Sequence, residues 1–166
     1  LQLTLPSGEA TLSPGTISDP DAASGAESQG SVLYLYLSAL QLSASAFESM
    51  TFQAEDWSFQ RFAKSQTVGM TPTKPVQLTS GASGAIRIGI RGIVIPRALS
   101  TPHISLTLNY SGIQGVQGSY SVFNVAIQNR PDGNAGDLSE VIGFSLFPDD
   151  VRIVNSVLPG LKANNQ

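Results

Sequence analysis

Short runs in which apolar and polar residues alternate recur along most of the chain and predict β-strands. The clearest run spans residues 104–110, where Ile104, Leu106, Leu108 and Tyr110 alternate with polar side chains. A period of two places such residues on one face of a strand, which is buried while the other face meets solvent. Comparable strands are predicted at residues 1–5, 31–37, 76–78, 86–90, 93–95, 122–127, 142–146 and 151–157.

Two of these runs carry further information. Residues 31–37 read SVLYLYL, so both faces of the strand are apolar, which indicates a central strand in a two-layer fold. Ile86, Ile88 and Ile90 share a face, whereas the next two isoleucines along the chain have the opposite parity. One extra residue near Gly92 would restore the face, so we expect a β-bulge there.

The remaining segments are less regular, and several of them are expected to be loops. Residues 41–47 fit a strand, although 46–50 would also fit one helical turn. The aromatic-rich segment 51–62 fits two strands or one bent strand, with the break at Glu55-Asp56. Turn-forming residues predict loops at 13–30 (long and mobile), 69–75, 79–84, 111–118 and 129–136, and a frayed polar tail at 162–166.

These elements together indicate an all-β fold. Eight or nine short strands without a sustained helical period predict an antiparallel two-sheet β-sandwich, either immunoglobulin-like or jelly-roll. A closed barrel is the alternative arrangement. We expect one domain over residues 1–166, and because the chain begins with Leu1 we expect a processed protein or an excised domain.

Composition excludes several classes of protein. Only 13% of the residues are charged, against about 25% in an average soluble domain. The chain has no Cys and one His, which excludes disulfide scaffolds, Cys-ligated metals and zinc sites with several His. A net charge of −3 argues against a nucleic-acid partner. None of the apolar runs is long enough to predict insertion into a membrane. Few charges with many Ser, Thr, Gly and Asn are typical of extracellular or surface-exposed proteins.

The few charges are sorted by sign along the chain. Residues 1–60 hold seven acids and no Lys or Arg, residues 61–130 hold seven bases and no acid, and residues 131–166 hold five acids and two bases. One interpretation is pairing of opposite charges across sheet faces within the molecule. A second is bipolar assembly of copies or partners. A third is a basic groove for an anionic ligand, for which Arg87 and Arg91 share a strand face.

Two further groups of residues are candidate binding sites. Trp57 and Phe59 could form an aromatic platform for a sugar ring, although their spacing of two also matches a buried strand face. Asp132, Asn134 and Asp137 place several oxygen ligands in one segment, which could hold calcium. The segment does not follow the EF-hand pattern, and Asp and Gly also favour plain turns, so we assign no cofactor.

Signals for catalysis are weak. His103 is the one histidine, and no G-x-S-x-G nucleophile elbow accompanies it. The adjacent carboxylates Glu55-Asp56 and Asp149-Asp150 would point to opposite faces of a strand, so neither pair converges on one bond. We therefore predict that the protein is not an enzyme. A glycan-active enzyme with carboxylates from distant segments is a third hypothesis, tested by the distance between them.

The first hypothesis for function is a non-catalytic extracellular, cell-surface or virion module that mediates protein–protein contact or self-assembly. It depends on the sandwich pattern, the low charge and the long polar loops, since loops on such scaffolds commonly carry recognition. The alternative is a carbohydrate-binding module with a glycan ligand, with or without calcium. A sequon for N-glycosylation, Asn109-Tyr110-Ser111, matters only in a eukaryotic secretory pathway.

Overall fold

The computed structural model describes residues 1–4, 8–22, 30–80, 86–91, 103–115, 120–129, 135–143 and 150–152, the last three ranges by their backbone alone. Strands dominate these ranges, and every pair of neighbouring strands is antiparallel. The predicted all-β class is therefore confirmed. The described ranges hold 13 strands, more than the eight or nine expected, because several of them are only two to four residues long.

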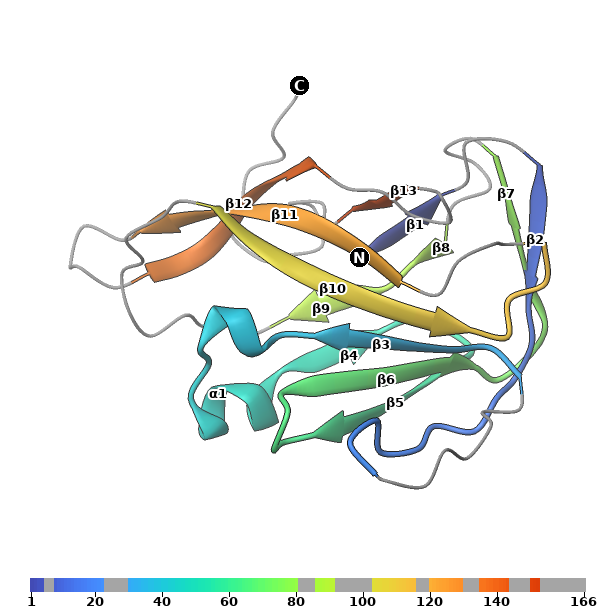
Figure 1. The fold of residues 1–166 in the computed structure, drawn as a ribbon, viewed down its shortest axis with the longest axis horizontal. Coiled ribbons are helices and arrows are strands. Elements are labelled where there is room, and N and C mark those ends of the chain that lie inside the picture. The colour runs from blue at the N-terminus through green and yellow to red at the C-terminus, as the bar shows by residue number, and fades with distance from the viewer. Residues whose placement is uncertain are drawn as a thin grey trace.

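One six-stranded sheet, called the large sheet below, forms the main layer (Figure 1). Its strand order is β12 (Ala135–Gly143), β11 (Tyr120–Asn129), β10 (His103–Ser111), β3 (Val32–Tyr36), β6 (Thr67–Pro72) and β5 (Trp57–Phe62). The strand predicted to be central, β3, lies inside this sheet between β10 and β6. Because β12 and β5 end the sheet without pairing to each other, the closed-barrel alternative is wrong.

Three small sheets complete the described strands. They are β13 (Asp150–Arg152) with β1 (Gln2–Thr4) and β8 (Ile86–Arg87); β2 (Glu9–Leu12) with β7 (Val76–Thr79); and β4 (Thr51–Gln53) with β9 (Gly89–Arg91). Ile88, between β8 and β9, exchanges backbone hydrogen bonds of 2.8 Å with Leu1 in both directions. Residues 86–91 thus change partner from β1 to β4, whereas the predicted bulge near Gly92 lies outside the described residues.

The hydrophobic core joins the large sheet to the small ones. Leu33, Leu35 and Leu37 are fully buried, and Leu106 and Leu108 of β10 lie in the same cluster. The small sheets add apolar side chains to this cluster: Leu1, Leu3, Ala10, Leu12, Leu78, Ile86, Ile88 and Ile90. The alternation predicted for residues 86–90 and 104–110 therefore marks faces that meet in one core.

Two short helices connect β3 to β4. A 3₁₀ helix spans Ser38–Leu40, and α1 spans Ala44–Ser49. The Ser43 hydroxyl caps α1 by accepting a hydrogen bond from the Ala46 N–H at 3.1 Å, which satisfies a donor that the helix leaves free. The helical turn is confirmed and the strand at 41–47 is wrong, because this cap and buried Phe47 direct the segment into a helix against the core.

Two loop predictions also need correction. Residues 69–72, expected in a loop, belong to β6, whose six residues are all buried. Pro72 is tolerated because it is the last residue of β6 and lies opposite Trp57, while β3 pairs only as far as Met70. Residues 135–136, expected in a turn, begin β12, which pairs with β11 across three register irregularities.

The described part of the predicted loop 13–30 has no helix or strand, as expected, but is fastened to the large sheet. The hydroxyl of Tyr34 accepts a hydrogen bond from the Ser18 N–H at 3.1 Å and donates one to the Ser18 carbonyl at 2.8 Å. Ile17 lies over Gly69, where a Cβ would collide with its side chain. We call residues 13–22 the strap; its mobility remains a prediction.

Candidate contact site at the β5 edge

Strand β5 is the last strand of the large sheet, and half of its backbone groups point away from the sheet. The carbonyl of Asp56, just before β5, accepts a hydrogen bond of 2.7 Å from the Thr73 N–H, so the even-numbered backbone groups face β6. In agreement, Trp57 lies opposite Pro72, which has no N–H to give. The N–H and C=O groups of Trp57, Phe59 and Arg61 therefore point to the outer edge, where no described strand pairs with them.

The inner face of β5 is aromatic and closes the core beside β4. Trp57 and Phe59, the predicted sugar platform, are half-buried and pack against the core. Phe59 stacks on Phe52 of β4, with ring centroids 4.9 Å apart and an interplanar angle of 14°. The two rings join the last strand of the large sheet to the β4–β9 pair, so Phe59 has a packing role here.

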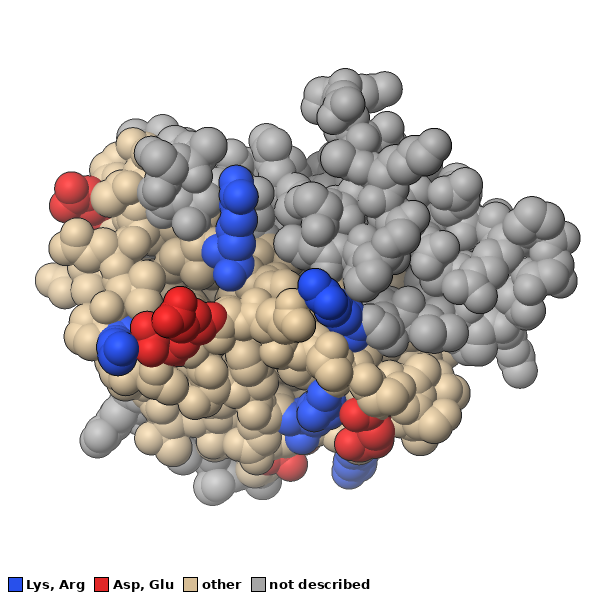
Figure 2. All heavy atoms as spheres, turned by 180° about the vertical axis from the view of Figure 1, so that it is seen from behind, with Lys and Arg blue, Asp and Glu red and all other residues tan. Residues whose placement is uncertain are grey.

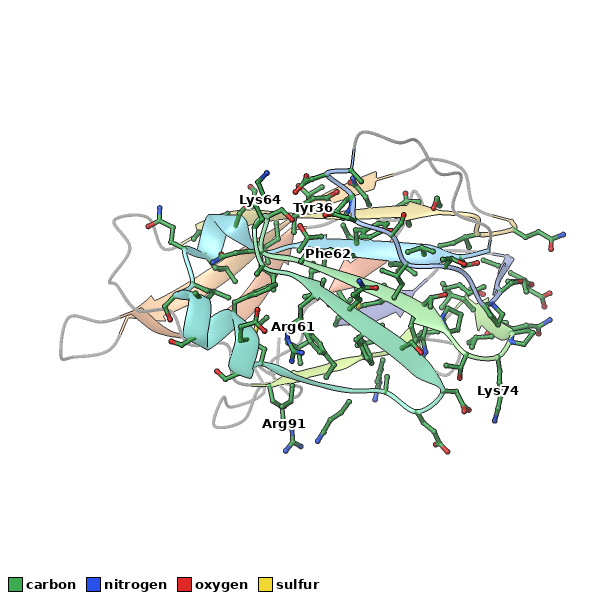
Figure 3. All side chains as sticks on the ribbon, turned by 90° about the horizontal axis from the view of Figure 1, so that it is seen from below. Tyr36, Arg61, Phe62, Lys64, Lys74 and Arg91 are labelled. Carbon is green, nitrogen blue, oxygen red and sulfur yellow. The ribbon has the colours of Figure 1, made fainter. Side chains whose placement is uncertain are left out.

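Arg61 lies on the same inner face as these rings. Its guanidinium carbon is 5.1 Å from the centroid of Phe52, and its Nη2 donates a hydrogen bond to the Met50 carbonyl. Its Nε is buried without a hydrogen-bond partner in the part of the chain that is described. Figure 3 shows Arg61 between β5 and the β4–β9 pair, whereas Arg91 points away from that space. A charge turned inward on an edge strand resists unselective pairing with other strands.

Opposite charges flank β5. The turn Glu55-Asp56 precedes the strand and Lys64 follows it, and all three side chains are exposed. Asp56 also forms an ion pair with Lys74, Oδ1 to Nζ 3.1 Å, and the two side chains are 41% and 71% exposed. Such an exposed pair contributes little to stability, about 0–1 kcal/mol. The edge strand thus has an acidic start and a basic end.

The predicted basic pair Arg87 and Arg91 lies apart from the aromatic residues of β5. Both arginines are exposed on the face of residues 86–91 opposite to the buried isoleucines, as the pattern predicted. Arg87 pairs in register with Gln2 and Arg91 with Thr51. Trp57 and Phe59 face the core instead, so the structure does not bring the two predicted groups together.

On the face of the molecule that Figure 2 shows, the charge segregation along the chain does not become an acidic end and a basic end. Figure 2 shows acidic and basic side chains close together in places on a largely uncharged surface. The ion pair between Asp56 and Lys74 joins the acidic and basic thirds of the chain directly. This pair fits the interpretation of charge pairing within the molecule.

Of the three predicted calcium ligands, the described residues include only the backbone of Asp137. Asp132 and Asn134 lie outside the described residues. Asp137 falls in β12, in register with Gln128 of β11, and only its backbone is described. No group of three or more His, Cys, Asp or Glu side chains that could hold a metal is found within the described ranges.

The outer face of the large sheet carries a second polar and aromatic group. The Nδ2 of Asn109, the sequon asparagine, donates a 3.3 Å hydrogen bond to the hydroxyl of Tyr36. Burial raises the pKa of Tyr36, the hydrogen bond from Asn109 opposes this, and the negative charge of Asp21 adds to it. Tyr34 packs against Phe62 with ring centroids 6.4 Å apart. These rings and the Asn109 amide lie beside the strap, and both Tyr36 and Asn109 are half-buried.

A polar network joins two of the predicted loops, 13–30 and 111–118. The Ser31 hydroxyl accepts a hydrogen bond from the Ser13 N–H at 2.8 Å and donates one to the Gly112 carbonyl at 2.7 Å. The Thr71 hydroxyl donates to the Ser31 carbonyl at 2.7 Å and accepts from the Gly15 N–H at 2.8 Å. The strap and the β10–β11 connection therefore meet at one end of the large sheet.

Comparison with known proteins assigns no family to this architecture. No family model matches the chain, and no curated protein or solved structure matches it either. No helix in the described ranges is long and apolar enough to cross a membrane.

Sequence reasoning missed Arg61 and Lys64 as members of the site. The signal for Arg61 was present, because it continues the period of two set by Trp57 and Phe59 and so places a charge on an apolar stripe. The sequence alone did not indicate Lys64, because its place in the site depends on β5 being an edge strand.

Proposed function

We propose that this chain is a non-catalytic module that mediates protein–protein contact or assembly, working outside the cell, on a cell surface or in a virion. The observation that supports it is the outer edge of β5, where the backbone groups of Trp57, Phe59 and Arg61 face no described strand. An edge of this kind accepts an additional strand, with backbone hydrogen bonds for affinity and side-chain pockets for specificity. The low charge and polar loops fit such a setting.

The proposed architecture behind this function is a β-sandwich. The large sheet would form one layer, and β13, β1, β8, β9 and β4 would form the other. The shared core of the two sets of strands supports this arrangement. In a sandwich, apolar side chains have to fill the space between the layers where β5 of one layer faces β4 of the other. The stacked rings of Phe52 and Phe59 occupy that space. The proposal covers both immunoglobulin-like and jelly-roll topologies.

A photo-crosslinking experiment tests the contact function. A photoreactive amino acid replaces Gln60, which is exposed on β5, and in a control protein it replaces Gln77, which is exposed on β7. Irradiation in the cells that make the protein should yield a protein adduct from position 60 and none from position 77. No adduct at position 60, or equal adducts from both positions, would overturn the proposal.

The alternative is a carbohydrate-binding module, and one observation favours it on a different surface from the one first expected. Tyr36, Asn109 and Asp21 combine an aromatic ring with polar groups near one another on the outer face of the large sheet. Trp57 and Phe59, by contrast, pack against the core. A glycan array with wild-type protein and Tyr36→Ala tests this: binding lost in the variant supports it, and no binding by wild type rejects it.

A further inference from the structure

The strand β5 lies where the charge of the chain changes sign. Every charged residue before it is acidic, ending with Glu55 and Asp56, and every charged residue from Arg61 to Arg130 is basic. Lys74 offsets Asp56 through their ion pair, so the edge that no described strand covers runs from a negative start at Glu55 to a positive end at Lys64. An antiparallel partner strand complements this edge if its basic end lies beside the acidic start of β5 and its acidic end beside the basic end. A second copy of β5, running antiparallel, has this arrangement of charges.

The alternation of faces limits how two copies can pair. Residues directly opposite each other in an antiparallel ladder share a face, so Trp57, Phe59 and Arg61 of one copy have to oppose odd-numbered residues of the other. A two-fold axis at Gln60 satisfies this condition. It places Phe59 opposite Arg61 of the second copy, and both residues present their backbone groups to the outer edge, where no described strand pairs with them.

The same register brings the charged ends together. The turn Glu55-Asp56 comes beside the turn that holds Lys64 of the second copy, with Glu55 as the acid that Lys74 does not already pair with, and the symmetry repeats this contact at the other end of the strand. A neighbouring register centred on Arg61 would place two arginines opposite each other. The inward charge of Arg61 therefore opposes the register in which it meets itself. A register centred on Phe59 would place Arg61 opposite Trp57, but it would bring Lys64 to Ala54 and away from the acids, so the charged ends favour the axis at Gln60.

We propose that two copies of this chain pair antiparallel through their β5 edges, with the axis at Gln60, and so join their large sheets into one continuous sheet. This inference rests on the proposed contact function and names its partner. An edge of six residues is short, so we expect a weak, reversible dimer that weakens further as salt is added.

Charge reversal at the two ends of β5 tests the pairing. Lys64→Glu and Glu55→Lys should each weaken self-association measured by sedimentation equilibrium, Lys64→Glu by about tenfold because both symmetry-related contacts become repulsive. An equimolar mixture of the two variants should dimerise again, since the acid introduced at position 64 of one variant then meets the base introduced at position 55 of the other. The matched controls Arg87→Glu and Glu9→Lys make the same charge changes at exposed sites away from β5 and should leave the dimer unchanged.

The outcomes separate the failure of this inference from that of the proposed function. A monomer at all concentrations, together with an adduct of a different protein at position 60, overturns the self-pairing and keeps the contact function. No adduct at all overturns both. Dimers that respond equally to the control variants, or that the mixture does not restore, overturn the β5 register, while circular dichroism and thermal melting verify that each variant is folded.

Discussion

Arg61 lies over the ring of Phe52, its guanidinium carbon 5.1 Å from the ring centroid, while its Nη2 donates to the Met50 carbonyl that precedes β4. The contact ties the edge strand of the large sheet to the β4–β9 pair. The outer edge of β5 keeps a defined position because its last inward side chain is held at both the ring and the carbonyl.

Removing this side chain should destabilise the fold. Arg61→Ala loses the hydrogen bond and the cation–π contact, so we expect the free energy of unfolding to fall by about 1–3 kcal/mol in urea titration. A double-mutant cycle with Phe52→Leu should give a coupling of about 0.5–1 kcal/mol. Lys74→Ala, at an exposed site, should change stability by less than about 0.5 kcal/mol. Strictly additive effects of the Arg61 and Phe52 substitutions would contradict the contact.

The close contact between the strap and the large sheet should depend on the absence of a side chain at Gly69. A Cβ there would collide with Ile17 and would lie 3.2 Å from Tyr34 and 3.3 Å from Phe62. Gly69→Ala should therefore push the strap from the sheet and speed the hydrogen exchange of the Ser18 N–H about tenfold or more. Ile17→Ala in the same chain should restore much of the protection. Unchanged exchange in Gly69→Ala would show that the strap does not need this close approach.

The side chain of Ser31 should contribute more to the free energy of unfolding than that of a surface serine. Its side chain is fully buried, and Ser31→Ala leaves the Ser13 N–H and the Gly112 carbonyl without their partner. We expect a loss of about 1–3 kcal/mol in the free energy of unfolding, because unpaired buried polar groups carry the full cost of desolvation. The matched control is Ser58→Ala, at an exposed position of β5, which should be nearly neutral. Equal effects of the two substitutions would contradict the network.

The amine of Leu1 should make stability depend on pH. Burial lowers its pKa from 8.0 to about 5, while the group donates to the Ile88 carbonyl at 2.8 Å. Between pH 8 and pH 5 the unfolded chain binds a proton that the folded chain does not. The free energy of unfolding of a protein with a free amine at Leu1 should therefore fall as pH falls through this window, by up to about 4 kcal/mol.

Acetylation of the Leu1 amine provides the comparison for this prediction. An acetylated nitrogen keeps an N–H for the Ile88 carbonyl but carries no charge at any pH. Denaturant titrations of the free and acetylated proteins should therefore converge near pH 8 and separate toward pH 5, with the acetylated form more stable. Any effect of His103 on the free energy of unfolding is common to both forms and cancels in their difference. Parallel curves of this free energy against pH would therefore contradict the burial of the amine.

The parts of the fold that follow a local period could be predicted. The alternation at residues 104–110 marks β10, the isoleucines of 86–90 mark a buried face, and SVLYLYL marks an interior strand. Strand β6 could not be predicted, because Gly69 and Pro72 are strand breakers in isolation. Gly69 is present because Ile17, far away in the sequence, lies against it, and Pro72 is accepted because the strand ends there.

The features of the candidate site were likewise only partly predictable from the sequence. Spacing placed Trp57 and Phe59 on one face, and counting charges located the sign change at Glu55 to Arg61. Neither could tell whether those rings meet a sugar or the core, and the structure packs them against the core. That outcome depends on β4, whose Phe52 stacks on Phe59, and the position of β4 depends in turn on residues 89–91.

By itself, the sequence determined that the chain forms antiparallel β-structure with few charges, because burial with a period of two and the sorting of charges are properties of neighbouring residues. Only the tertiary structure decided which strand is left at the edge, which way Arg61 turns and which loop meets Ser31. Those features depend on partners 11 to 81 residues apart along the chain, and no local pattern records which distant strand completes a sheet.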